Sequence, residues 1–173
     1  MFKKNYFEKF DRYFLFYLIF LAFCSIVFLY SKHTVGNDTS ISEWLINYQG
    51  GFTRRGVIGE ICFHLADFFK ISLRSVIFIF QTSVYLIYLC LIYLFFKKIK
   101  HNVITIFAIF TPIFLLYPVA EVEALGRKEV FLYIYFLGFL SLMNTGSNYK
   151  KYSNLYIIFV TPIICLIYEQ IIH

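Results

Sequence analysis

The residues best suited to chemistry lie in two short polar segments of an otherwise apolar chain. The first segment, Asn47–Glu60, contains paired glycines, which permit an irregular backbone, followed by Arg54 and Arg55. Both arginines precede a predicted helix, whose free N-terminal amides favour an anion, and guanidinium groups bind phosphate oxygens in pairs. We therefore predict that Arg54 and Arg55 form a pyrophosphate-binding site. The alternative is a simple turn whose arginines contact lipid headgroups.

The second polar segment, Glu121–Glu129, places three carboxylates and two cations between two apolar stretches. A short link between helices needs only a few polar residues, so five charges at this position favour a functional site. We predict that this segment positions a general base together with phosphate-binding cations, Arg127 and Lys128. The alternative is that these charges only pair with one another.

A third candidate is Glu169, a carboxylate near the end of the last apolar run. An ionisable group inside a membrane segment is costly unless it is paired or functional, so we predict a functional role for Glu169. The alternative is that Glu169 already lies among lipid headgroups. Asp38 and Glu43 are weaker candidates.

The composition indicates that lipid surrounds these segments. Of the 173 residues, 60% are hydrophobic and only 15% are charged, and the charges gather between long uncharged runs. A bilayer crossing needs about 20 apolar residues and requires helical hydrogen bonding. We therefore predict a single all-α transmembrane domain over residues 1–173, with five spans: Tyr13–Tyr30, Val76–Phe96, Val103–Ala120, Val130–Met143 and Leu155–Ile172. A β-barrel is a distant second, because period-two alternation is missing.

Between the first two spans, residues 31–75 form the one sizeable loop outside the membrane. Apolar residues from Val57 to Phe69 recur at helical spacing and predict an amphipathic helix in the outer interface. With the N-terminus in the cytoplasm, nine of the 16 basic residues lie inside and seven outside. Both polar segments then open on the outer face of the cell membrane.

Several partners and cofactors are not expected. The net charge of +6 is dispersed at the ends of apolar segments, so no nucleic-acid partner is predicted. The four cysteines lack the spacing of a zinc or redox pair, and we expect neither a metal nor a cofactor.

The layout of Gly50–Glu60 and Glu121–Glu129 resembles bacterial polytopic membrane proteins of surface-polysaccharide assembly, namely O-antigen-polymerase-like proteins and glycosyltransferases that use polyprenyl-phosphate donors. The resemblance implies a lipid-linked sugar as partner, arginines that grip its phosphates, and a carboxylate such as Glu123 or Glu169 that deprotonates the acceptor hydroxyl. Such enzymes have about twice as many spans, so the resemblance also implies that this chain is an N-terminal portion.

The competing hypothesis is a non-enzymatic membrane module that pairs with other membrane subunits, a transporter component, or a truncated chain without independent activity. Transport predicts ionisable residues deep within the spans. Here the most polar residues inside the spans are Gln81, Thr111 and Thr161, so transport ranks below the lipid-linked sugar.

Overall fold

The computed structural model describes residues 2–35, 39–51, 53, 55–99, 103–143 and 149–168. Within these ranges the chain is helical and no strand occurs, which confirms the all-α prediction. Three helices are long and apolar enough to cross a membrane, namely Phe10–Val35, Leu73–Lys98 and Tyr149–Ile167. The finding is compatible with a membrane protein.

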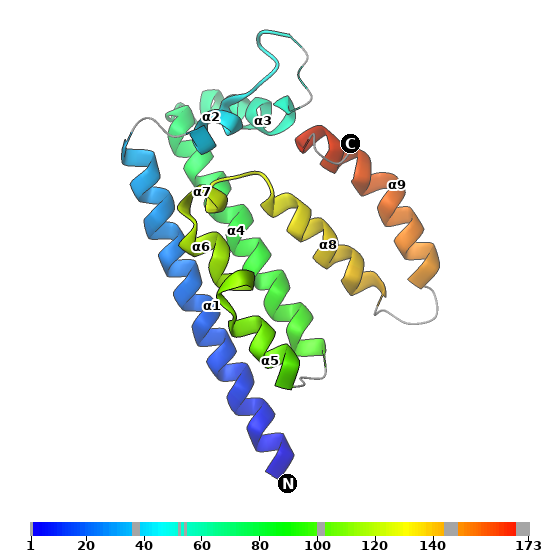
Figure 1. The fold of residues 1–173 in the computed structure, drawn as a ribbon. Helices are drawn as coiled ribbons and strands as arrows, with labels where there is room; N and C mark the ends of the chain where they lie inside the picture. The colour runs from blue at the N-terminus through cyan, green and yellow to red at the C-terminus, as the bar shows by residue number, and fades with distance from the viewer. Residues whose placement is uncertain are drawn as a thin grey trace.

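Helices α1 (Phe2–Val35) and α4 (Leu73–Lys98) run side by side and form the long axis of the bundle (Figure 1). The predicted spans Tyr13–Tyr30 and Val76–Phe96 lie within them. Ser72 caps α4, because its hydroxyl accepts a hydrogen bond of 3.1 Å from the backbone N–H of Ser75. One side of α1 leaves large apolar residues exposed, including Phe16, Phe20 and Phe23, as a lipid-facing helix would.

The predicted third span, Val103–Ala120, is an interrupted helix. It consists of α5 (Val103–Phe110), a π-helical turn η1 (Pro112–Leu116) and α6 (Tyr117–Ala120). The break follows from Pro112, which has no N–H to donate and which favours an extended conformation at Thr111. A short helix, α7 (Val122–Leu125), comes directly after it.

Helices α8 (Val130–Met143) and α9 (Tyr149–Ile167) complete the bundle. Helix α8 has the bounds predicted for the fourth span and packs between α4 and α9. Helix α9 begins six residues before the predicted Leu155, and residues 169–172 of that prediction lie outside the described residues. Pro162 is accommodated inside α9, whose helix continues to Ile167.

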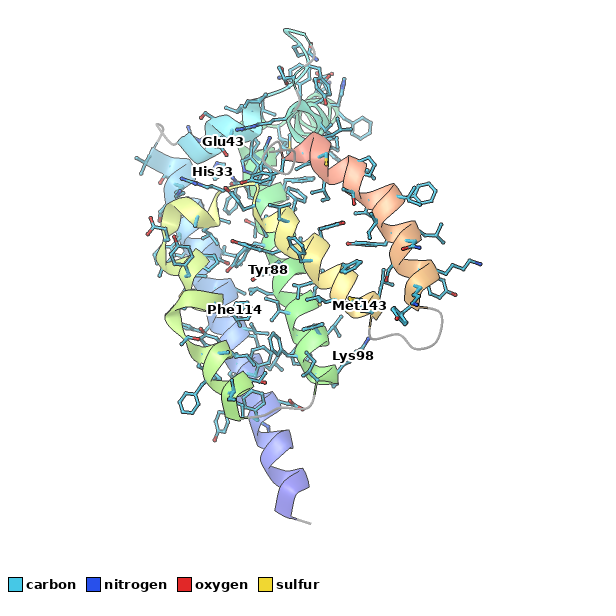
Figure 2. The ribbon with its side chains drawn as sticks, turned by 45° about the vertical axis from the view of Figure 1, so that its right-hand side comes forward. His33, Glu43, Tyr88, Lys98, Phe114 and Met143 are labelled. Carbon is cyan, nitrogen blue, oxygen red and sulfur yellow. The ribbon has the colours of Figure 1, made fainter. Side chains whose placement is uncertain are left out.

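Helices α2 (Thr39–Leu45) and α3 (Gly56–Phe69) lie across the end of the bundle away from the N-terminus (Figure 1). Helix α3 confirms the predicted amphipathic helix, and it buries Ile58, Cys62 and Ala66 against neighbouring helices. We call this the α2–α3 end. Figure 2 shows His33 and Glu43 near it, whereas Lys98 and Met143 lie toward the opposite end.

Two buried apolar clusters hold the bundle together. One lies among α1, α4 and the segments from α5 to α8, around residues such as Leu21, Ile92 and Leu115. The other joins α2, α3, α4 and α9 around Trp44 and Ile77. Because the second cluster brings α2, α3 and α9 together, it also fixes the polar groups carried at their ends.

Candidate functional site

A buried lysine marks the α2–α3 end as the candidate site. Lys128, in the link before α8, is only 2% exposed. Its Nζ donates a hydrogen bond of 2.9 Å to the backbone oxygen of Arg55, 73 residues away, and Arg55 is the residue that precedes α3. The fold thus joins the two predicted polar segments at this bond. An ammonium has three donors, and this bond uses one of them.

The charge of Lys128 is costly at this position. The pKa of its ammonium is lowered to about 8, mainly by burial and also by Arg55, while Glu43 and the Cys62 thiol act in the opposite direction. Burial also raises the pKa of Cys62 to about 11, and Lys128 moderates that rise. Near neutral pH the site therefore holds a protonated lysine that readily loses its proton.

The lowered pKa of Lys128 makes the stability of the protein depend on pH. The folded-state pKa of about 8 lies below the ordinary value of 10.5, so the unfolded chain binds this proton more tightly. The destabilising contribution is complete below pH 8 and is relieved as the pH rises from about 8 to 10.5. We expect the melting temperature in detergent to rise across that window relative to Lys128→Met, which lacks the titrating group. Parallel curves for the two proteins would contradict this prediction.

Glu129 is a half-buried carboxylate in the link before α8. Its Oε1 accepts a long hydrogen bond of 3.4 Å from the Tyr168 hydroxyl and lies 3.9 Å from Nη1 of Arg127. Its Oε2 is buried and has no hydrogen-bond partner among the described residues. A buried carboxylate oxygen without a donor is costly, and such atoms are frequent where a ligand or water completes the site.

One electrostatic cluster unites these groups. The Tyr168 hydroxyl donates a hydrogen bond to Glu129, and Tyr168 also interacts electrostatically with Arg55 and Glu43. These last two residues act on Lys128 as well. We define the polar cluster as Glu43, Arg55, Arg127, Lys128, Glu129 and Tyr168. It draws on α2, the start of α3, the link before α8 and the end of α9.

Hydrogen bonds to a backbone carbonyl fix the link that contains Lys128. The carbonyl oxygen of Gly126 accepts hydrogen bonds from Trp44 Nε1 at 2.7 Å and from Gln81 Nε2 at 3.0 Å. The Gln81 Oε1 atom in turn lies 3.2 Å from Nε2 of His33. Because one carbonyl holds donors from α2 and α4, the link cannot move independently of either helix.

Glu60 has a structural role in the loop before α3. Its carboxylate accepts hydrogen bonds of 2.9 Å from the backbone N–H of Tyr48 and from the side-chain amide of Gln49. His64 Nε2 lies 3.1 Å from the same carboxylate. These bonds fold the segment around Gly50 and Gly51 back onto α3, and thereby place Arg55 at the helix start.

The predicted site residues have different outcomes. Arg55 and Lys128 lie together, and Arg127 lies beside them, half-exposed and near Glu129. Arg54 and Glu169 lie outside the described residues, as does the side chain of Glu123, whose backbone belongs to α7.

Sequence reasoning missed three members of the polar cluster. Glu129 was within the second polar segment, yet its neighbours gave no sign that it would be half-buried. Glu43 ranked low because its role depends on the packing of α2, and no feature of the local sequence singled out Tyr168.

No group of three or more histidine, cysteine or acidic residues that could hold a metal ion occurs in the part of the chain that the structure describes. The three cations of the polar cluster could bind an anion, and its two carboxylates could accept a proton.

No protein-family model matches the chain, and comparisons with curated proteins and with solved structures give no match. Function has to be inferred from the chemistry of the polar cluster.

Proposed function

We propose that the chain is a cell-membrane protein that crosses the bilayer five times. Beyond the three long helices, Ile104–Ala120 and Val130–Met143 are shorter apolar helical segments. The 14 residues of α8 are roughly 21 Å long, shorter than a typical hydrocarbon core, so a thinner local bilayer or polar flanking residues would accommodate it. Helix α3 would then lie in the interface, with exposed apolar residues such as Ile61 and Phe68 toward lipid.

The proposed orientation has a cytoplasmic N-terminus. Lys97 and Lys98 end α4 on the side away from the α2–α3 end, and Lys150 and Lys151 begin α9. Bare basic pairs of this kind favour the cytoplasmic face. The polar cluster would accordingly open outward.

The activity we propose for the polar cluster is binding the phosphate of a polyprenyl-phosphate-linked sugar during assembly of surface polysaccharide. The main support is the contact between Lys128 and Arg55, which keeps a lysine cation buried where burial is unfavourable. A buried charge is rare in proteins unless it has a partner or a function, and an anionic ligand would attract this ammonium and offset the cost of its burial. A hydrocarbon-anchored phosphate fits a site at the end of apolar helices.

The carboxylates have the complementary role in this proposal. A base must accept the proton of the acceptor hydroxyl when that oxygen attacks the sugar, and Glu129 offers an oxygen that has no hydrogen-bond partner among the described residues. Glu123 and Glu169 remain predicted bases. Arg55, Arg127 and Lys128 would stabilise the negative charge that develops on the leaving phosphate.

Binding of polyprenyl diphosphate to the protein in nanodiscs tests this proposal. A charge-assisted hydrogen bond contributes about 1.5–3 kcal/mol, so Arg55→Ala and Arg127→Ala should each weaken binding by roughly 10-fold or more. Lys97→Ala, which removes an exposed cation at the far end of α4, is the matched control. Equal affinity of all three variants and the wild type would refute the assignment. In cells, the first two variants should also shorten the polysaccharide.

A second candidate function is a non-enzymatic membrane module in which the polar cluster only joins helices. The observation in its favour is that several polar groups already satisfy one another, as when Trp44 and Gln81 both bind the Gly126 carbonyl. In that case Gln81→Ala would destabilise the protein, and no variant of the cluster would alter lipid-diphosphate binding.

A further inference from the structure

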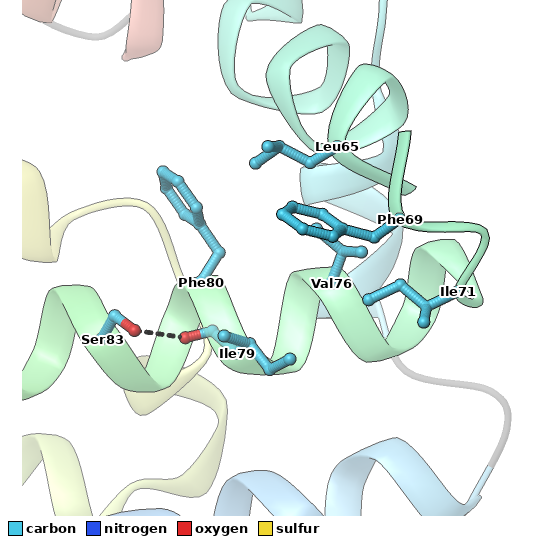
Figure 3. A pocket seen from close by; sticks show the side chains of 7 residues that line it. All are labelled: Leu65, Phe69, Ile71, Val76, Ile79, Phe80 and Ser83. Carbon is cyan, nitrogen blue, oxygen red and sulfur yellow. Dashed lines mark hydrogen bonds between the residues drawn. The ribbon is translucent and has the colours of Figure 1, made fainter. Parts of the chain in front are cut away.

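An apolar hollow lies between α3 and α4, separate from the polar cluster. It has a volume of about 330 Å³, within the range of small-molecule sites. Figure 3 shows Leu65 and Phe69 of α3 around the hollow together with Val76, Ile79 and Phe80 of α4. Ile71 and Ser83 complete the lining, and the Ser83 hydroxyl is already bonded to the carbonyl of Ile79 at 2.7 Å. The hollow therefore offers almost no free polar group to a ligand.

The shape of the hollow fits a hydrocarbon chain. Val76 and Ser83 are seven residues apart on α4, which is roughly 10 Å along the helix axis. Ile79 and Phe69 are 56% and 60% exposed, so the hollow opens to the surroundings of the bundle. With α4 across the bilayer and α3 in its interface, those surroundings are acyl chains that run along α4.

A cation lies at the interfacial end of the hollow. Lys70 is exposed, and it ends α3 in a left-handed conformation with φ 54°, directly before the lining residue Ile71. The ammonium of this exposed lysine complements the phosphate of a lipid headgroup. Charge at one end and hydrocarbon along the rest match the two parts of a phospholipid.

We propose that this hollow binds one acyl chain of a membrane phospholipid, whose phosphate lies beside Lys70. The bound chain fills the space between α3 and α4 and thereby anchors the interfacial helix to the spanning helix. The proposal rests on the proposed bilayer placement, and it is independent of the sugar chemistry of the polar cluster.

The single tryptophan of the chain provides the test. Trp44 is buried, and its ring centroid lies 6.0 Å from that of Phe80, which lines the hollow. Bromine atoms on lipid acyl chains quench tryptophan at short range only. In vesicles of phosphatidylcholine brominated near the middle of its chains, Trp44 of the wild type should be quenched. Ser83→Phe, which fills the hollow, should lose most of that quenching.

Cys90→Phe is the matched control, because Cys90 is exposed two turns further along the same face of α4. Its Trp44 should be quenched as in the wild type. Equal quenching in Ser83→Phe would overturn the proposal. So would relief of quenching by a small amount of unbrominated polyprenyl phosphate, which would assign the hollow to that lipid.

A separate variant tests the bilayer placement itself. With Trp44→Phe and Leu94→Trp combined, the only tryptophan lies at an exposed position of α4. Strong quenching there establishes contact with lipid independently of the hollow. Its absence would refute both the placement and the bound acyl chain, whereas failure of Ser83→Phe alone would leave the proposed function unaffected.

Discussion

Lys128→Ala is expected to destabilise the protein by about 3 kcal/mol and to abolish lipid-diphosphate binding, because three losses coincide. The carbonyl of Arg55 loses its donor, Glu43 loses the attraction of a nearby cation, and the buried side-chain stem leaves a void. Thermal unfolding in detergent and nanodisc binding measure the two effects.

Lys128→Met separates packing from charge. The methionine retains most of the stem and removes only the ammonium, whose burial is itself unfavourable. We expect a smaller loss of stability than for alanine together with an equal loss of binding. Lys97→Ala, at an exposed position, should change neither property. If Lys128→Ala had the same melting temperature as Lys97→Ala, the buried lysine would have no structural role, and the description of the polar cluster would be wrong.

The helices that sequence predicts well are those whose pattern is long and local. The apolar run within α1 and the amphipathic period of α3 each extend over several turns, so neighbouring residues suffice to define them. Their ends were less predictable, because α1 continues to Val35 and α9 begins at Tyr149. Polar residues are tolerated at these two helix ends because each helix extends beyond its apolar run.

A contrast between two similar segments shows where local pattern fails. Thr111-Pro112 interrupts the helix, with Thr111 extended at ψ 140°, whereas Thr161-Pro162 lies inside the continuous α9. The Thr161 hydroxyl shares a hydrogen bond of 2.8 Å with Tyr135 of α8, while that of Thr111 bonds back to Ala108 within its own helix. The two Thr-Pro segments therefore differ by a contact between helices, which cannot be predicted from a local sequence pattern.

The polar cluster was predictable in residue type and unpredictable in pairing. Charge near apolar segments identified Arg55, Arg127 and Lys128 as unusual. That Lys128 would meet the backbone of Arg55 depends on how α2 and α3 lie over the link before α8. The same packing brings Glu43 near Lys128, so its contribution appears only once the helices are assembled.

The packing of α2 on α3 depends on one glycine, and Gly59→Ala is expected to disrupt it. A Cβ at position 59 would collide with the backbone oxygen of Ile46 and lie 2.6 Å from its carbonyl carbon and 2.9 Å from the Trp44 oxygen. These are backbone atoms, which cannot turn aside as a flexible side chain would. We expect a loss of stability of about 3 kcal/mol, because α3 must move away from residues 44–46.

That movement should also reach the polar cluster. Trp44 holds the Gly126 carbonyl through its indole N–H, so displacing it frees the link that carries Lys128. We expect the emission of this single tryptophan to shift to the red and lipid-diphosphate binding to weaken. Gly50→Ala is the matched control, since its Cβ would meet no atom within 4 Å, and it should keep wild-type stability and emission. The description of the packing at Gly59 would be wrong if Gly59→Ala had the same melting temperature as Gly50→Ala and kept the emission of a buried tryptophan.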